Sequence, residues 1–231
     1  GVGMSGIARV AHDQGMRVSG SDLKESRYTK QLRDAGVEVH IGHSPSNIFG
    51  EGAEDGPDIV VVSTAILDNP ELESARERGL TIWHRAQMLA RLGDGLSTLA
   101  VAGTHGKTTT SSMLASALDA LGDDPTFLIG GIVRAYGTNA RSGSGPHYVV
   151  EADESDKSFR FLSPKAVLVT NIEADHLDHY RDLSEIHEKF QAFIASVPDD
   201  GLAVVCGDDA ALLDLAHAAE RPLLSYGFGE G

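Results

Sequence analysis

The chain has a single cysteine and no long apolar run, and both scarcities limit what it can be. The one cysteine, Cys206, excludes a disulfide within the chain and favours a reducing compartment such as the cytoplasm. Because Cys206 lies in the apolar run 202–206, we expect it to be a buried structural thiol. No stretch reaches the roughly 20 apolar residues that a membrane-spanning helix needs, and no signal peptide opens the chain. We therefore expect a cytoplasmic protein without membrane insertion.

Basic residues are scarce as well, with 19 Lys and Arg against 34 Asp and Glu. The resulting net charge of -15 repels the phosphate backbones of nucleic acids, so a nucleic-acid-binding role is not expected. The chain has 231 residues, 41% of them hydrophobic, which is enough material for two cores. Two domains are the better starting hypothesis, and the sequence is compatible with either a monomer or a homodimer.

Short apolar strands alternate with helix-like stretches along the first half of the chain. The predicted strands are 18–20, 37–41, 59–62 and 80–83. This alternation predicts βα units and a parallel sheet, as in a doubly wound, Rossmann-like domain. The chain turns polar and flexible at 93–95, and we place a domain boundary between residues 94 and 95.

The second half, 95–231, continues the alternation. Strands are predicted at 99–102, 148–150, 166–170 and 202–206, and helices at 108–121 and 183–195. These elements predict a second α/β domain with a mostly parallel sheet. The glycine- and serine-rich segment 137–146 is predicted to be a flexible loop that can reach a ligand.

The strongest motif is a glycine-rich segment between an apolar strand and an amphipathic helix, made up of Gly103, Thr104, His105, Gly106, Lys107, Thr108 and Thr109. Its glycines let main-chain N–H groups converge on phosphate oxygens, and the helix N-terminus adds partial positive charge. We expect Lys107 to reach the β- and γ-phosphates of ATP and the Thr108 hydroxyl to bind magnesium. Val101 stands where the common pattern has glycine, so the match is to the shorter G-x-x-G-K-T form. The alternative is a glycine-rich turn that only caps a structural helix.

Two further strands end in polar clusters. The strand 148–150 is followed at once by the acidic run 151–156, and carboxylates in such a position beside a phosphate loop are well placed to hold magnesium. Glu151 is the first of them, although a solvated acidic loop is the usual reading of such clusters. The strand 166–170 is followed by Asn, Glu, Asp and His residues, which indicates metal or phosphate contact. Spacing alone leaves His176 and His179 as alternatives.

The opening segment 1–6 matches G-x-G-x-x-G, and Asp22 follows at the distance usual for an acid that contacts a ribose. A close turn between helix and strand, without any ligand, explains the match almost as well. Such a loop normally follows a strand, so we expect a further strand upstream of Gly1.

Three segments of the second half, 103–110, 151–156 and 171–180, together resemble the Mur ligase family. Their order and spacing also fit, and the resemblance covers essentially the whole chain. Within the family, His105, the run 151–156 and the segments 3–8 and 84–89 are similar to the branch that joins L-alanine to UDP-N-acetylmuramate.

The resemblance implies an ATP-dependent amide ligase of peptidoglycan biosynthesis, with UDP-N-acetylmuramate, L-alanine and ATP as substrates and Mg²⁺ or Mn²⁺ as cofactor. It implies a Rossmann-like domain for the UDP-sugar at 1–94, followed by a P-loop-type, mostly parallel α/β central ATPase domain at 95–231. Family members have a third, C-terminal domain, which we expect beyond Gly231. A fragment that ends there is expected to be inactive by itself.

Roles for individual residues follow from the same resemblance. Lys107 matches the phosphate-loop lysine, Thr108 the magnesium-binding hydroxyl, and Glu151 a magnesium ligand. The family pattern also favours His176 over His179 as the histidine at a second metal site. The residues expected to contact the UDP-sugar are Gly1, Gly3, Asp22, Ser63, Thr64, His84, Arg85, Asn139 and Arg141.

Other functions stay open at this stage. A related ligase that acts on a murein tripeptide or on folate is one, although the segment 171–180 argues against both. An NAD-dependent dehydrogenase would account for the segment 1–6 and for Asp22, but it has no use for the phosphate loop. A non-catalytic module that binds a UDP-sugar or a nucleotide is the third.

Overall fold

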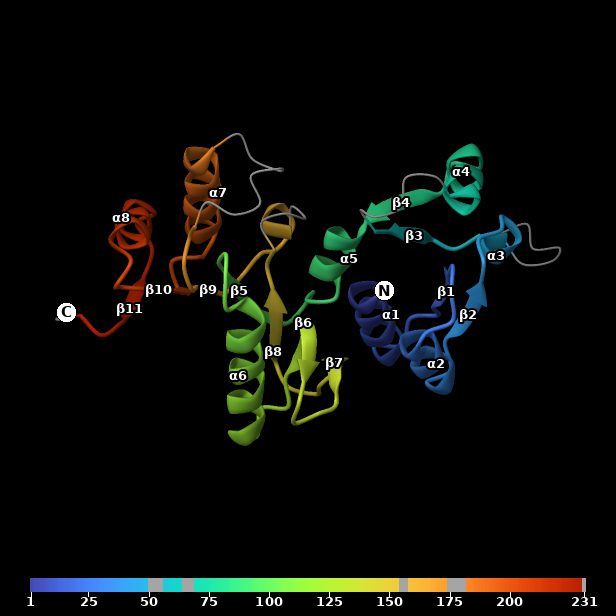
Figure 1. Ribbon diagram of the computed structural model, residues 1–231, viewed down its shortest axis with the longest axis horizontal. Coiled ribbons are helices and arrows are strands. Elements are labelled where there is room, and N and C mark those ends of the chain that lie inside the picture. The colour runs from blue at the N-terminus through green and yellow to red at the C-terminus, as the bar shows by residue number, and fades with distance from the viewer. Residues whose placement is uncertain (50–55, 64–68, 154–157, 174–181, 230–231) are drawn as a thin grey trace. The chain divides into compact units, whose positions relative to one another are not determined.

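The chain folds into two compact α/β units, shown in a computed structural model (Figure 1). The structure describes residues 1–49, 56–63, 69–153, 158–173 and 182–229. The first unit comprises Gly1–Leu92 and Ala140–Ser142, and the second comprises Gly93–Asn139 and Gly143–Gly231. The grouping of Ala140–Ser142 with the first unit is a feature that the sequence did not indicate.

The first unit alternates helices with short strands. Its helices are α1 (Val2–Asp13), α2 (Arg27–Asp34), α3 (Ser46–Phe49), α4 (Pro70–Glu77) and α5 (Arg85–Arg91). Its strands are β1 (Ser19–Asp22), β2 (Glu38–Ile41), β3 (Ile59–Val62) and β4 (Thr81–His84). β1 pairs with β2 and β3 pairs with β4, both in parallel. Each strand predicted in this half is present, and the ends differ from the prediction by no more than two residues.

Side-chain caps define where two helices of this unit begin. The Ser26 hydroxyl accepts from the Thr29 N–H at 3.3 Å, while the Thr29 hydroxyl accepts from the Ser26 N–H at 2.8 Å, and α2 starts there. The Asn69 side chain accepts from the Glu71 N–H at 2.8 Å, and Pro70 occupies the first position of α4. The cap fixes Glu71 in the first turn of α4.

The opening segment is helical and not a loop, which corrects the sequence interpretation. α1 begins at Val2, so Gly3 and Gly6 lie on the helix. A Cβ atom at Gly3 would lie 3.0 Å from Nη1 of Arg85, at the start of α5. The glycine at this position therefore permits a close approach between α1 and the Arg85 side chain.

The second unit is built on one large sheet. Its strands are β5 (Ser97–Ala102), β6 (Thr126–Val133), β7 (Thr138–Arg141), β8 (His147–Glu151), β9 (Ala166–Val169), β10 (Leu202–Cys206) and β11 (Leu223–Tyr226), in the spatial order β11-β10-β9-β5-β8-β6-β7. From β11 to β6 each neighbouring pair is parallel. Because these strands are parallel, the carboxyl ends of β5, β8 and β9 lie at the same end of the sheet. The residues predicted to bind the nucleotide follow there.

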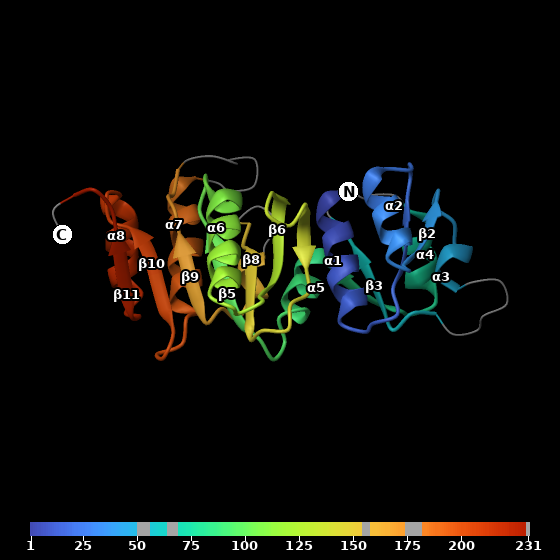
Figure 2. The ribbon, with the colours of Figure 1, turned by 90° about the horizontal axis from the view of Figure 1, so that it is seen from below.

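Helices cover both faces of this sheet. α6 (Lys107–Ala120) lies on one face, and α7 (Leu183–Ala195) and α8 (Ala210–Ala218) lie on the other (Figure 1). Figure 2 shows α6 running along the sheet in front of its central strands. The short helix η1 (Ser158–Arg160) precedes β9, and its Phe159 ring stacks on Phe193 of α7 with centroids 4.2 Å apart. Val101 and Val149, in β5 and β8, are fully buried, as expected for strands covered on both faces.

Three features of the second unit differ from the sequence prediction. The segment 137–146 is not a loop throughout, because Thr138–Arg141 forms β7. Strands β6 and β11 and helix α8 were not predicted. Cys206 is half-buried, not fully buried, and it is the last residue of β10, at the carboxyl end of that strand. Among the described residues, no helix is both long and apolar enough to cross a membrane.

Candidate functional site

The loop that joins β5 to α6 has the shape of a phosphate loop. β5 ends at Ala102 and α6 begins at Lys107. Gly103 and Gly106 have φ angles of 129° and 84°, which residues with side chains rarely adopt. The Lys107 ammonium reaches back over the loop and donates to the carbonyl oxygens of Gly103 (2.6 Å) and Thr104 (3.3 Å). Its charge therefore lies at the N-terminal end of α6, where the helix dipole is also positive.

The exit of the neighbouring strand β9 holds this loop. The N–H groups of Thr104 and His105 donate to the main-chain and side-chain oxygens of Asn171, at 3.0 and 2.9 Å. The His105 carbonyl oxygen accepts from the Thr170 hydroxyl at 2.6 Å and from the Asn171 amide at 3.1 Å. The Glu173 N–H donates to the Thr104 hydroxyl at 2.8 Å. These bonds fix the loop at the N-terminus of α6, the end of a helix that favours a phosphate group.

Glu151, the last residue of β8, faces the start of α6. Its carboxylate accepts hydrogen bonds from the Gly130 N–H and the Thr108 hydroxyl. Burial raises the pKa of Glu151 above its ordinary value, although these hydrogen bonds and the charge of Lys107 act in the opposite direction. Its Oε1 atom is buried and has no hydrogen-bond partner among the described residues. A buried, unpaired carboxylate oxygen is costly unless a cation binds it.

Two glycines of β6 make room for this arrangement, and the sequence analysis did not single them out. A Cβ atom at Gly130 would lie 2.7 Å from Oε2 of Glu151, and one at Gly131 would lie 2.9 Å from Cγ2 of Thr108. The available signal was a Gly-Gly pair between apolar residues, which marks a close approach within a strand. Its partner could not be identified because Glu151 is far away in the sequence.

The oxygens of Thr108 and Glu151 fit a magnesium ion, which prefers hard oxygen ligands in small number. Within the described ranges, no group of three or more His, Cys, Asp or Glu residues could hold a metal. Several residues singled out by sequence lie outside the described part of the chain, namely Thr64, Glu154, Asp156, His176 and His179. The roles expected for them stay predictions.

In the first unit, three predicted UDP-sugar residues lie at the carboxyl ends of strands. Asp22 ends β1, Ser63 follows β3, and His84 ends β4. Asp22 accepts from the Lys24 N–H at 3.4 Å. Ligands of open α/β sheets bind beyond such strand ends.

Two of the residues predicted to contact the UDP-sugar, His84 and Asn139, have structural partners. His84 caps α5: its Nδ1 accepts from the Ala86 N–H at 3.3 Å, and the Gln87 side chain accepts from the His84 N–H at 2.9 Å. Asn139 is buried in β7 and donates to the Ile129 carbonyl oxygen at 3.3 Å. These bonds explain the residue types at 84 and 139 without a ligand.

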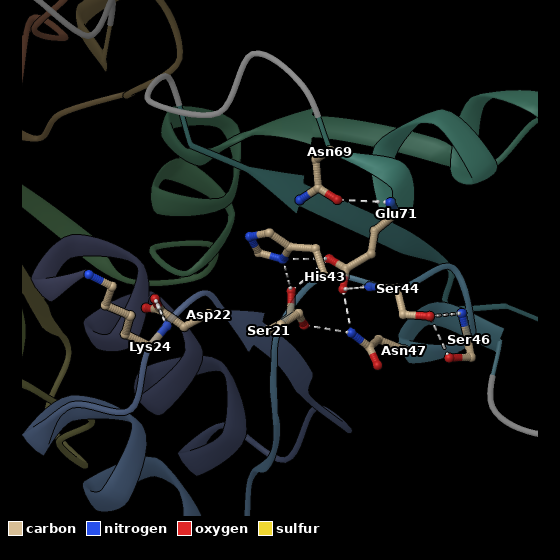
Figure 3. A network of polar contacts seen from close by, with 10 residues as sticks. Ser21, Asp22, Lys24, His43, Ser44, Ser46, Asn47, Asn69 and Glu71 are labelled. Carbon is tan, nitrogen blue, oxygen red and sulfur yellow. Dashed lines mark hydrogen bonds and ion pairs between the residues drawn. The ribbon is translucent and has the colours of Figure 1, made fainter.

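A polar network of the first unit was missed by the sequence analysis (Figure 3). Its centre is Glu71, whose side chain is only 11% exposed. One carboxylate oxygen accepts from the Ser44 N–H (3.2 Å) and the Asn47 amide (2.6 Å), and the other accepts from the Ser21 hydroxyl (2.6 Å). Nδ1 of His43 lies 2.9 Å from Oγ of Ser21. Burial acts to raise the pKa of Glu71, but the hydrogen bonds dominate and lower it.

A parallel sheet with a phosphate loop after one strand and a carboxylate at the end of its neighbour defines a P-loop-type, nucleotide-binding α/β protein. The chain belongs to the Mur ligase family. Residues 1–95 match the model for "Mur ligase family, catalytic domain", and residues 101–231 match the "Mur ligase middle domain". The second match alone spans more than half of the chain.

Curated relatives are similar over the full chain. It is 46% identical to the UDP-N-acetylmuramate--L-alanine ligase of Carboxydothermus hydrogenoformans and 50% identical to that of Laribacter hongkongensis. These matches cover 100% and 98% of this chain but 49% and 48% of the relatives. The chain thus spans about half the length of the curated relatives it matches.

Solved structures of the family superpose closely. The UDP-N-acetylmuramate-alanine ligase of Thermotoga maritima matches with a TM-score of 0.83 and 32% identity, over 100% of this chain and 51% of that one. The UDP-N-acetylmuramate:L-alanyl-gamma-D-glutamyl-meso-diaminopimelate ligase from Neisseria meningitides matches with a TM-score of 0.86 and 30% identity, over 100% of this chain and 78% of that one.

Proposed function

We propose that the chain provides the ATP site and the sugar-nucleotide domain of an ATP-dependent ligase that joins L-alanine to UDP-N-acetylmuramate, in peptidoglycan biosynthesis in the cytoplasm. The observation that carries the ATP site is the meeting of Lys107, Thr108 and Glu151 at one edge of the parallel sheet. The observation that favours L-alanine is the 46–50% identity to ligases named for that amino acid.

The chemistry explains why such a site is needed. A carboxylate is a poor electrophile, so the lactyl carboxylate of the sugar nucleotide first takes the γ-phosphoryl group of ATP and becomes an acyl phosphate. The amine of L-alanine then attacks the acyl carbon, and inorganic phosphate leaves. No covalent enzyme intermediate is required, so Cys206 needs no nucleophilic role.

The residues of the chain act by binding and orientation. The Lys107 ammonium and the N–H groups of the first turn of α6 hold the phosphates in line with the acceptor carboxylate. Thr108 and Glu151 would hold a magnesium ion, which when bound neutralises charge on the transferring phosphoryl group. Asn171 keeps the loop fixed through its bonds to Thr104 and His105.

A second candidate is the murein tripeptide ligase reaction. A solved ligase named for that tripeptide superposes on this chain with a TM-score of 0.86. Its identity to this chain is 30%, close to the 32% of the solved L-alanine ligase, whereas the curated L-alanine ligases reach 46–50%. Both reactions use the same acyl phosphate, so the ATP site does not distinguish them. The higher identity supports L-alanine.

Phosphate release distinguishes the two reactions. A full-length ligase carrying this sequence should release phosphate from ATP with UDP-N-acetylmuramate and magnesium when L-alanine is supplied, and much more slowly with glycine or L-serine. The murein tripeptide should be inactive as the amino substrate. Activity with the tripeptide and none with L-alanine would replace the proposed reaction by the second candidate.

Glu151→Gln should make the ligand-free chain more stable while removing its response to magnesium and ATP. A carboxyl whose pKa is raised on folding destabilises the fold when ionised: the penalty is absent below the ordinary pKa of 4.5 and complete above the raised value. The glutamine carries no charge, so we expect melting about 1–3 °C higher near pH 7. Magnesium with ATP should then give little further stabilisation.

Differential scanning fluorimetry checks both parts, with Glu188→Gln on the exposed face of α7 as the matched control. The control should melt like the wild type and keep its response to magnesium and ATP. A Glu151→Gln variant that melts lower, or that still responds fully, contradicts the assignment of Glu151 as a magnesium ligand.

A further inference from the structure

The geometry points to a specific role for the Glu71 network: Glu71, acting through Ser21, fixes the His43 imidazole in the tautomer whose Nε2 accepts a hydrogen bond. His43 thereby selects a hydrogen-bond donor, an N–H or O–H group, on the sugar nucleotide. This inference rests on the proposed function, because it concerns the sugar-nucleotide site of the first unit. Glu71 and Ser21 are positioning residues, and His43 is the binding residue.

The first step follows from counting hydrogens. The Glu71 carboxylate can only accept, so the Ser21 hydroxyl must donate its single hydrogen across their 2.6 Å contact. Oγ of Ser21 then has only lone pairs left for Nδ1 of His43, 2.9 Å away. Nδ1 must therefore carry a hydrogen. Oε2 of Glu71, 3.5 Å from the same nitrogen, favours this arrangement electrostatically.

The second step concerns the other ring nitrogen. In a neutral imidazole with a hydrogen on Nδ1, Nε2 is an acceptor. Figure 3 shows this nitrogen directed away from Glu71 and Ser21, and none of the described residues forms a hydrogen bond with it. The His43 side chain is 14% exposed, so the ring is held firmly but is not sealed off from solvent.

The position of His43 connects the network to a ligand. Gly42 separates it from the end of β2, and the Gly42 N–H donates to the Asp22 carbonyl oxygen at the end of β1, 2.9 Å away. The imidazole thus lies at the carboxyl ends of two paired parallel strands, where sugar nucleotides bind in open α/β sheets. A ligand group that faces Nε2 must donate, since an acceptor there would meet a lone pair.

Glu71→Gln tests the proposal because it should reverse the direction of the hydrogen bonds from residue 71 through Ser21 to His43. The amide oxygen can keep the hydrogen bonds from the Ser44 N–H and Asn47, which leaves the amide NH₂ beside Ser21. Oγ of Ser21 then accepts from the amide, and its own hydrogen goes to Nδ1 of His43. The imidazole changes to the Nε2–H tautomer and presents a donor where the wild type presents an acceptor.

Nitrogen-15 NMR of histidine-labelled chain near pH 8, where imidazole is ordinarily neutral, reports the tautomer directly. We expect the wild type to show Nδ1–H at His43 and Glu71→Gln to show Nε2–H, both without ligand. Ser46→Ala is the matched control, because among the described residues the Ser46 hydroxyl contacts the Ser44 hydroxyl at the edge of the network, and its loss should leave the tautomer unchanged. An Nε2–H tautomer in the wild type, or an unchanged Nδ1–H tautomer in Glu71→Gln, overturns the proposal.

Calorimetric titration of the same proteins connects the tautomer to recognition. Glu71→Gln should bind UDP-N-acetylmuramate about tenfold more weakly than the wild type, while Ser46→Ala should bind as the wild type does. UDP, its N3-methyl derivative, and 2′-deoxy- and 3′-deoxy-UDP then locate the donor on the base or the ribose. If the wild type and Glu71→Gln bind UDP itself with equal affinity, the donor lies on the N-acetylmuramate portion of the ligand. The analogue that lacks the donor should bind both proteins equally.

The outcomes separate this inference from the function on which it rests. If the wild type binds neither UDP nor UDP-N-acetylmuramate, the proposed function fails, and the NMR result still decides the tautomer. If the wild type binds them and Glu71→Gln binds every one of them with unchanged affinity, the sugar-nucleotide function stands. The proposed role of His43 is then overturned.

Discussion

Lys107→Ala should reduce ATP-dependent phosphate release about a hundred- to a thousandfold in a full-length ligase carrying this sequence. The Lys107 ammonium is held over the phosphate loop by two carbonyl oxygens, 2.6 and 3.3 Å away, at the positive end of α6. Charge on a transferring phosphoryl group is stabilised by such a fixed cation, and a methyl group cannot replace it. Steady-state phosphate release with L-alanine and UDP-N-acetylmuramate measures the loss.

Two further variants define what Lys107 contributes. Lys107→Arg keeps the charge but replaces a compact ammonium by a planar group, so we expect only partial recovery. Lys189→Ala, on the exposed side of α7, should behave as the wild type. Turnover of Lys107→Ala within a few-fold of the wild type would remove the ATP-site assignment.

Gly103→Ala should cost about 3 kcal/mol of folding free energy or more, a large stability effect for a single methyl group. Its φ of 129° is strained for alanine. In addition, the new Cβ would overlap the Thr170 hydroxyl oxygen and lie 3.0 Å from the Asn171 carbonyl oxygen. Urea unfolding measures the loss, and nucleotide affinity should fall with it because the phosphate loop must move.

Gly122→Ala separates the two causes, since it lies just beyond the other end of the same helix. Its φ of 85° is strained in a similar way, but no atom lies within 4 Å of the added Cβ. We expect a loss of about 1–2 kcal/mol there. Equal losses at both positions would mean that the contact with Thr170 relaxes without cost.

Patterns that are local in the sequence predicted the fold class and the phosphate loop. The spacing of Gly103, Gly106 and Lys107 between a strand and a helix contains its own structural context, so the loop could be found without any long-range information. The strands β3 and β10 were predicted with the same bounds for the same reason, because each is a continuous apolar run.

What could not be predicted depends on contacts between distant segments. Asn171 was noted only as one of the polar residues that follow a strand. Its hydrogen bonds to the phosphate loop depend on the pairing of β5 with β9, which the sequence does not reveal. Glu71 was not singled out, because only the fold brings it to Ser21 and His43. Strand β6 was missed because Gly130 and Gly131 interrupt its apolar pattern.

The bonds that join Thr104 and His105 to residues 170–173 have a consequence for how fast a nucleotide binds. They are made within the protein, so the loop is preorganised and little chain entropy is lost when a phosphate arrives. Association should then follow a single diffusion-controlled phase without a slow ordering step. Asn171 touches no phosphate in this scheme. Loss of its side chain should therefore slow nucleotide association more than it speeds nucleotide dissociation.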